Sequence, residues 1–113
     1  MRRIGLISDT HGTFDDTLRE FLRDVDEVWH AGDIGSLAVA DEIAAFKPLR
    51  AVYGNIDGWD VRRVYPEVAV FDVEGFRVLM TPSAVIPITT TVVRWRIFTR
   101  RVQRFLLRAI LIS

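Results

Sequence analysis

Short segments that predict strands alternate with longer segments of helical pattern along the first half of the chain. Residues 3–8 are a short apolar run typical of a buried strand, and residues 25–30 and 49–53 predict a second and a third strand. Between them, residues 13–24 and 36–46 repeat their apolar positions at helical spacing, which predicts two amphipathic helices. The order strand, helix, strand, helix, strand is typical of an α/β fold with a mostly parallel sheet.

Polar residues at the helix starts support these two helices. Asp15 and Asp16 fall in the first turn of the first helix, where the helix dipole favours negative charge. Ser36 is suited to cap the second helix through its hydroxyl oxygen. The second helix should end at Lys47, because Pro48 cannot continue it.

A hairpin is predicted next, with strands at residues 68–73 and 76–80 around Glu74 and Gly75. Beyond Pro82 the alternation of strands and helices stops. The sequence therefore divides near this point into two parts with different patterns.

The second part predicts two elements. Residues 86–93 are apolar and β-branched, which indicates a strand. Residues 93–111 predict a helix, because arginines recur there at every fourth position. These arginines are Arg96, Arg100, Arg104 and Arg108.

The composition is that of one soluble globular domain, since 50% of the 113 residues are hydrophobic and 27% are charged. The chain has no cysteine, so any metal must be held by oxygen or imidazole ligands. The first apolar run is too short for a signal peptide or a membrane span. We therefore expect a cytoplasmic protein.

Charge is divided sharply along the chain. All fifteen acidic residues lie at or before Glu74, and nine of the fifteen basic residues lie within residues 1–81, which therefore carry a net charge of −6. Residues 82–113 hold six arginines and no acid, so they carry +6. Such asymmetry indicates that the second part is a different kind of segment.

Polar side chains follow each of the three predicted parallel strands. Asp9 and His11 come after the first strand, Asp33 after the second, and Asn55 with Asp57 after the third. The carboxyl ends of parallel strands form one crevice, so we expect these residues to converge. Carboxylate, imidazole and amide ligands suit manganese, iron, zinc or magnesium. Two such cations about 3.5–4 Å apart can clamp a phosphoryl group around a bridging hydroxide.

Each cluster also has a plain structural interpretation. An Asp-x-His sequence after a strand is more often structural than catalytic, and Gly54-Asn55 can be an ordinary turn. His30 precedes its loop, which favours a packed, hydrogen-bonded histidine. Asp57 is interpreted first as a turn residue and then as support behind the ligands. Together and in order, the clusters favour a metal site.

The motifs resemble those of the calcineurin-like metallophosphoesterases, most closely their small bacterial and archaeal phosphodiesterase subgroup. Three segments within residues 1–81 carry the resemblance: Gly5-Leu6-Ile7-Ser8-Asp9-Thr10-His11-Gly12, His30-Ala31-Gly32-Asp33 and Val52-Tyr53-Gly54-Asn55-Ile56-Asp57.

The resemblance implies a metal-dependent hydrolase of phosphate esters, with a small molecule or a nucleotide as substrate. Asp9 and His11 would hold the first of two divalent cations, Asp33 would bridge both, and Asn55 would hold the second. Asp33 and Asn55 are accordingly the predicted catalytic residues. The implied fold is an αββα sandwich of two sheets, of which residues 1–81 would supply the N-terminal half.

The chain also departs from the family. Many members have a histidine proton donor after the asparagine, where this chain has Ile56, as is common in the subgroup. The family continues after residues 76–81 with a histidine ligand and a Gly-His-x-His pair, whereas no histidine follows His30 here. Most of the second sheet should be missing as well. The resemblance therefore implies impaired activity.

A shifted reading frame after Thr81 accounts for these departures together. Codons that encode residues 81–86 and 108–113 can spell the missing histidine motifs in the neighbouring frame. Such a tail would not be selected to complete the sheet, whose apolar face would stay exposed. The alternatives are an interaction protein whose basic amphipathic tail binds nucleic acid or anionic membrane, and a remnant without a partner.

Overall fold

The computed structural model describes residues 2–8, 10–12, 14–73, 76–82, 84–87, 95–102 and 105–112. The strands are β1 (Arg2–Ile7), β2 (Glu27–His30), β3 (Leu49–Ala51), β4 (Ala69–Val73), β5 (Phe76–Thr81), β6 (Ala84–Pro87), β7 (Trp95–Val102) and β8 (Phe105–Ile112). The helices are α1 (Asp16–Leu22), α2 (Leu37–Phe46) and α3 (Trp59–Val64).

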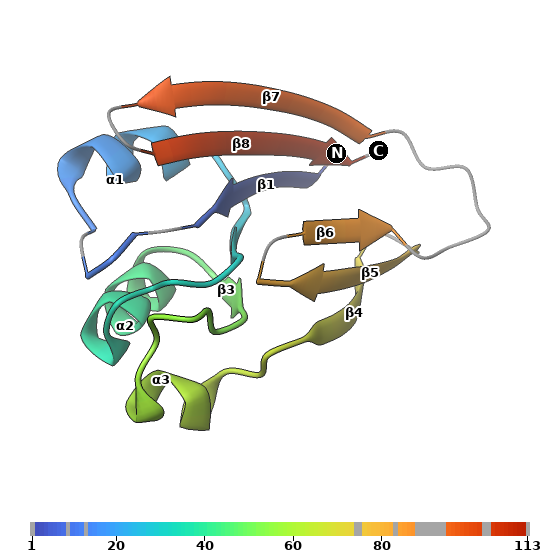
Figure 1. The fold of residues 1–113 in the computed structure, drawn as a ribbon. Coiled ribbons are helices and arrows are strands. Elements are labelled where there is room, and N and C mark those ends of the chain that lie inside the picture. The colour runs from blue at the N-terminus through green and yellow to red at the C-terminus, as the bar shows by residue number, and fades with distance from the viewer. Residues whose placement is uncertain are drawn as a thin grey trace.

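The strands form two sheets (Figure 1). The larger sheet has the order β3-β2-β1-β8-β7, and the smaller sheet has the order β4-β5-β6. β1, β2 and β3 are parallel, as the alternation of strands and helices predicted. β8 runs antiparallel to both β1 and β7. The fold is therefore mixed α/β, and its parallel part carries the loops in which the sequence places the site.

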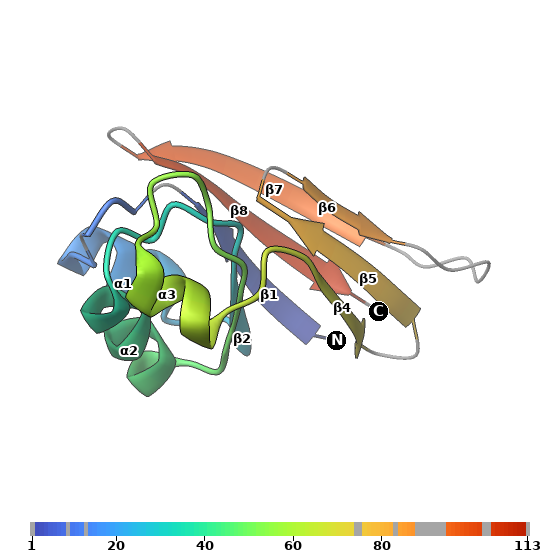
Figure 2. The same ribbon diagram turned by 60° about the horizontal axis from the view of Figure 1, so that its bottom comes forward.

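The helices cover one face of the larger sheet, and the smaller sheet covers the other (Figure 2). On the helix side, Leu18 of α1 and Ile43 of α2 pack with Val28 of β2 in one buried cluster. Between the sheets, Trp29 is fully buried and meets the ring of Phe71 edge-on, with the centroids 5.1 Å apart. Each face of the parallel strands thus has its own apolar core.

The sheet face that we expected to be exposed is covered. Ile4 of β1 and Val52, which directly follows β3, are buried with Val78 and Met80 of the smaller sheet. The expectation of an uncovered face was wrong because β4, β5 and β6 already form a second layer. β6 overlaps the strand predicted at residues 86–93, of which residues 88–93 lie outside the described part of the chain.

The helix predicted at residues 93–111 is also wrong. The described residues of this range form β7 and β8, and β8 continues the larger sheet beside β1. The regular arginine spacing is not an apolar stripe, whereas the β-branched and aromatic residues between the arginines favour strands. The tail does extend the sheet, contrary to our expectation.

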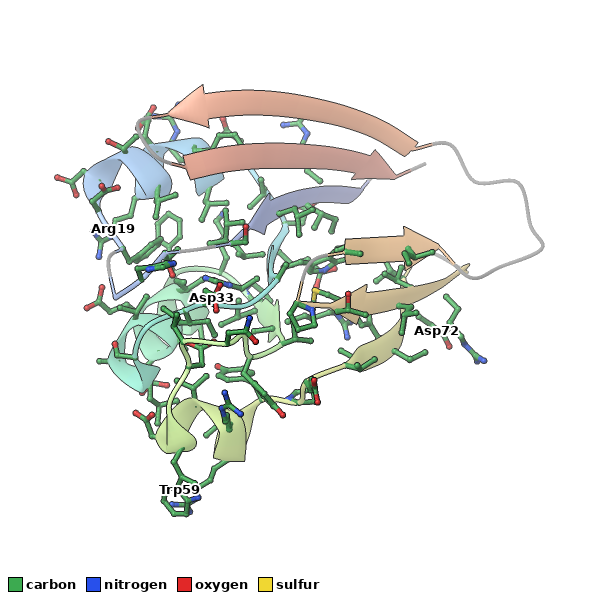
Figure 3. The ribbon with its side chains drawn as sticks, in the orientation of Figure 1. Arg19, Asp33, Trp59 and Asp72 are labelled. Carbon is green, nitrogen blue, oxygen red and sulfur yellow. The ribbon has the colours of Figure 1, made fainter. Side chains whose placement is uncertain are left out.

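The short helix α3 was not predicted. Its six residues place Val61 inside, whereas Trp59 is 73% exposed and points away from the body of the protein (Figure 3). One buried residue gives no helical period that a sequence pattern could reveal.

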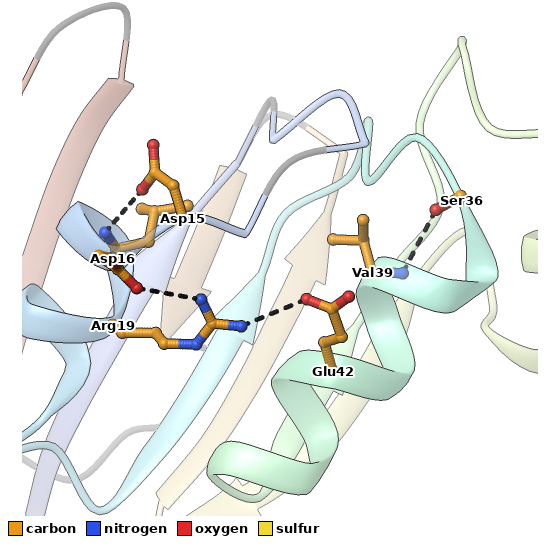
Figure 4. Close-up of polar contacts among 7 residues, drawn as sticks. Asp15, Asp16, Arg19, Ser36, Val39 and Glu42 are labelled. Carbon is orange, nitrogen blue, oxygen red and sulfur yellow. Dashed lines mark hydrogen bonds and ion pairs between the residues drawn. The ribbon is translucent and has the colours of Figure 1, made fainter.

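Side-chain caps define the starts of α1 and α2 (Figure 4). Asp15 accepts from the amide of Leu18 at 3.0 Å, so it caps α1 instead of lying within its first turn. Ser36 caps α2 as predicted, by accepting from the amide of Val39 at 3.3 Å. No helix in the described part of the chain has the length and apolar character needed to cross a membrane.

Candidate metal centre

Three loops meet at the carboxyl ends of β1, β2 and β3. The loop after β1 is bonded to the loop after β2 by two backbone hydrogen bonds, from the amide of His11 to the carbonyl of Asp33 at 3.1 Å and from Gly12 to Ile34 at 2.7 Å. The loop after β3 joins them, because the amide of Ile56 donates to Asp33 Oδ1 at 3.2 Å. Asp33 therefore lies where the three loops meet (Figure 3).

His11 and Asp33 have left-handed backbones, with φ of 50° and 58°. They are the described non-glycine residues with positive φ. This conformation is unfavourable for residues with a side chain and is concentrated at functional sites. Both residues had been predicted as metal ligands from their position after a strand. Their shared left-handed backbone is a structural feature, independent of the sequence pattern, that distinguishes these two positions from the other described non-glycine residues.

Glycines allow the loops to approach each other this closely. A side chain at Gly35, where φ is 103°, would overlap the amide nitrogen of Gly12. A side chain at Gly54 would overlap the carboxylate of Asp33. The close approach of the loops therefore depends on the absence of side chains at these positions.

The described candidate ligands differ in exposure. His11 and Asn55 are exposed, and Asp33 is half-buried. Asp9 lies outside the described residues. The described residues contain no group of three histidine or acidic side chains that could hold a metal. The candidate ligands among them are His11, Asp33 and the side-chain amide of Asn55. This donor set suits a hard or borderline divalent cation.

Asp57 is not available as a ligand. It is 2% exposed, and its carboxylate accepts hydrogen bonds from three backbone amides. Arg62 of α3 holds the same turn from outside, donating from Nε to the carbonyl of Asp57 at 2.7 Å and from Nη2 to that of Asn55 at 3.4 Å. Sequence reasoning missed Arg62, because an exposed arginine in an unpredicted helix gives no signal.

His30 is a packed histidine with both ring nitrogens in hydrogen bonds. Its Nδ1 accepts from the amide of Gly32 at 3.1 Å, so Nε2 carries the hydrogen and donates to Thr10 Oγ1 at 2.9 Å. The Thr10 hydroxyl in turn donates to the carbonyl of Ile34 at 2.9 Å. Complete burial lowers the pKa of His30 from 6.5 to about 4, although Asp57 and Asp33 act in the opposite direction. His30 is therefore neutral at physiological pH and links the first two loops.

The protein is an α/β sandwich with carboxylate, imidazole and amide groups in the loops that follow its parallel strands. The model of the calcineurin-like phosphoesterase superfamily domain matches residues 1–102 of the sequence. The chain belongs to this family. The match includes the three motifs within residues 1–81 and extends to the end of β7.

Individual relatives show the same likeness. The chain is 33% identical over 93 residues to a probable metallophosphoesterase of Methanothermobacter thermautotrophicus, with 74% of this chain and 51% of the relative covered. Its fold is similar to Vps29 of Chaetomium thermophilum, with a TM-score of 0.57 and 17% identity over 70% of this chain and 45% of that one. The fold is also similar to vacuolar protein sorting 29 of Cryptosporidium parvum, with a TM-score of 0.59 and 18% sequence identity. This similarity covers 71% of this chain and 49% of that one. The chain thus spans about half the length of these proteins.

Proposed function

We propose that this chain is a divalent-metal-dependent phosphoesterase with impaired turnover. The observation that carries the proposal is the junction of three loops at Asp33, with His11 and Asp33 both held in left-handed conformations. Because the chain belongs to the calcineurin-like phosphoesterase family, we interpret this junction as the means by which His11, Asp33 and Asn55 are brought together as metal ligands. A phosphate ester of a small molecule or a nucleotide is the proposed substrate, and the cytoplasm is the proposed location.

Each residue has a proposed role. Asp9 and His11 would hold one cation, Asp33 would bridge two, and Asn55 would hold the second. The cations, which are manganese, zinc, iron or magnesium, would supply positive charge that stabilises the phosphoryl group during its transfer to water. Asp33 keeps its orientation through the amide of Ile56. Ile56 cannot give a proton to the leaving group, so that step would fall to water.

The impairment follows from the ligand count. The family resemblance implies three further imidazole ligands, whereas the sequence has His11 and His30 as its only histidines. Each missing ligand weakens metal binding, and a site that holds its cation less often supplies less positive charge to the substrate. We therefore expect weak metal binding and slow hydrolysis.

Calorimetry with Mn²⁺ tests the proposal. The wild-type chain should bind Mn²⁺ weakly, and Asp33→Ala should abolish binding, because the carboxylate would contact both cations. Asp41→Ala is the control, since Asp41 is an exposed residue of α2. Equal affinity of Asp33→Ala and wild type would refute the assignment.

Hydrolysis of bis-p-nitrophenyl phosphate with Mn²⁺ then tests the impairment. We expect turnover far below that of an intact relative and further loss in His11→Ala. Fast turnover that depends on His11 would show that the missing histidines matter less than proposed.

A non-catalytic alternative rests on the charge of the tail. β7 contains Arg96, Arg100 and Arg101, and residues 82–113 contain no acid. The described residues of the tail form strands and not the predicted amphipathic helix. In this alternative, the positively charged strand β7 would contact nucleic acid or anionic lipid. Binding to RNA or anionic vesicles that weakens as salt rises, without Mn²⁺-dependent turnover, would favour this alternative.

We also propose that residues 1–81 are a metallophosphoesterase half-domain and that residues 82–113 come from a shifted reading frame. The abrupt change in charge at this boundary supports the proposal. A shifted segment can still form strands, because strand pairing uses backbone groups. The nucleotide sequence from codon 75 onward tests it directly, and an uninterrupted family frame through these codons would exclude it.

A further inference from the structure

The carboxylate of Asp57 connects two of the three loops of the candidate metal centre. Its Oδ1 accepts from the amide of Gly35 at 2.8 Å, and its Oδ2 accepts from the amides of Ile34 at 3.2 Å and Gly54 at 2.8 Å. Ile34 directly follows Asp33, and Gly54 directly precedes Asn55. One buried side chain therefore bonds to the chain neighbours of two candidate ligands.

These hydrogen bonds act on the conformation of Asp33. Its left-handed backbone, with φ of 58°, turns the amides of Ile34 and Gly35 toward Asp57. Left-handed residues with a side chain are disfavoured by roughly 1–2 kcal/mol, so surrounding contacts must hold them. Hydrogen bonds from amides to a carboxylate are stronger than those to neutral acceptors, which suits this task.

We propose that Asp57 is a positioning residue that sets the separation and orientation of Asp33 and Asn55 as metal ligands. This inference rests on the proposed function of the site. This role requires a carboxylate at position 57, because its three hydrogen-bond partners are all backbone N–H donors and both side-chain oxygens must accept. An asparagine at this position would turn its own NH₂ group toward at least one of them, leaving a buried donor unpaired.

The substitution Asp57→Asn should therefore lower Mn²⁺ affinity about tenfold to a hundredfold, the usual effect of removing a partner that orients metal ligands. It should also speed hydrogen exchange of the amides of Ile34, Gly35 and Gly54. Asp60→Asn is the matched control, because the Asp60 carboxylate is exposed and accepts from its neighbour Val61 at 2.9 Å. Asp60→Asn should leave both measurements unchanged.

A second control separates positioning from general loss of stability. Ile43→Val removes a methyl group from the core of α2, where Ile43 is fully buried. It should lower the melting temperature and leave Mn²⁺ affinity at the wild-type value. If Ile43→Val and Asp57→Asn lost affinity equally at equal loss of stability, the positioning role would be refuted.

A measurement on the wild-type chain covers the case in which Asp57→Asn does not fold. If the hydrogen bonds of Asp57 help Asp33 and Asn55 to bind Mn²⁺, then bound Mn²⁺ must in turn stabilise these hydrogen bonds, because coupling between two sites is reciprocal. Mn²⁺ should therefore slow exchange of the amides of Ile34, Gly35 and Gly54 more than that of Lys47, which closes α2 by donating to Ile43 at 2.9 Å. Equal slowing at Lys47 would overturn the inference.

The outcomes distinguish this inference from the function on which it rests. Failure of the wild-type chain to bind Mn²⁺ would remove the proposed function and the inference with it. Binding that is lost in Asp33→Ala and unchanged in Asp57→Asn would leave the function in place and overturn the role of Asp57 alone.

Discussion

His30 makes stability depend on pH at the level of a single side chain. Its pKa is about 4 in the folded protein and 6.5 without burial, so the unfolded chain binds more protons between these values. The free energy of unfolding should therefore fall as pH drops from about 6.5 toward 4, by a total of about 3 kcal/mol, and this contribution should not change further below pH 4.

Chemical unfolding of the wild type and His30→Asn in metal-free buffer measures this difference. Asparagine retains an acceptor for the amide of Gly32 and does not titrate. The wild type should lose stability more steeply than the variant between pH 6.5 and 4. Parallel curves would mean that His30 does not carry the effect.

Substitutions at Gly35 and Gly12 distinguish two ways in which an added side chain lowers stability, namely backbone strain and steric overlap. Both have positive φ, but a methyl group at Gly12 meets nothing within 4 Å, whereas at Gly35 it overlaps the backbone of Gly12. Gly12→Ala should lower the free energy of unfolding by about 1–2 kcal/mol through backbone strain alone. Gly35→Ala should cost clearly more, as measured by denaturant unfolding, because the loops must also separate.

Among the helices and strands, α2 offers a direct test of capping. Ser36→Ala removes the acceptor for the amide of Val39 and should lower the free energy of unfolding by about 1 kcal/mol. Ser36→Asp retains an acceptor and adds a favourable charge at the helix start, so its stability should match or exceed that of the wild type. Thermal unfolding of the three proteins checks this order.

The elements that the sequence predicted well are those with local signals. The strands predicted at residues 3–8, 25–30 and 49–53 correspond to β1, β2 and β3, because each is a short segment that ends at a loop and alternates with a helical pattern. The predicted helix at residues 36–46 corresponds to α2, because Ser36 and the apolar spacing agree.

The elements that failed depend on distant partners. The described residues of 93–111 form strands because β8 pairs with β1, where Ile110 lies opposite Ile4. No local pattern reports such a partner. At the site, the order of motifs indicated that the loops of His11 and Asp33 would meet, as they do, whereas the roles of the ligands remain predictions. The hydrogen bonds of Asp57 and Arg62 could not be predicted, because they depend on loop conformation.

The position of β7 and β8 in the larger sheet predicts how residues 82–113 respond to protease. Arg96, Arg100, Arg101 and Arg108 lie in β7 and β8, and a strand held in a sheet does not fit a protease active site without local unfolding. Limited trypsin digestion should therefore spare these four positions under conditions that digest the heat-unfolded chain completely. Rapid cleavage at these positions would show that β7 and β8 are not stably held.

The position of β8 beside β1 has a consequence for the order of folding. β1 pairs with β2 across the short connection through α1, but its other edge pairs with β8, so that Arg2 lies opposite Ile112. Closing so long a loop is slow compared with closing a short one. During synthesis on the ribosome, this edge of β1 would stay open until β8 emerged, and an open strand edge invites pairing between molecules. Slow translation of the tail should therefore favour aggregation of the nascent chain, even though the finished sheet has β1 enclosed on both edges.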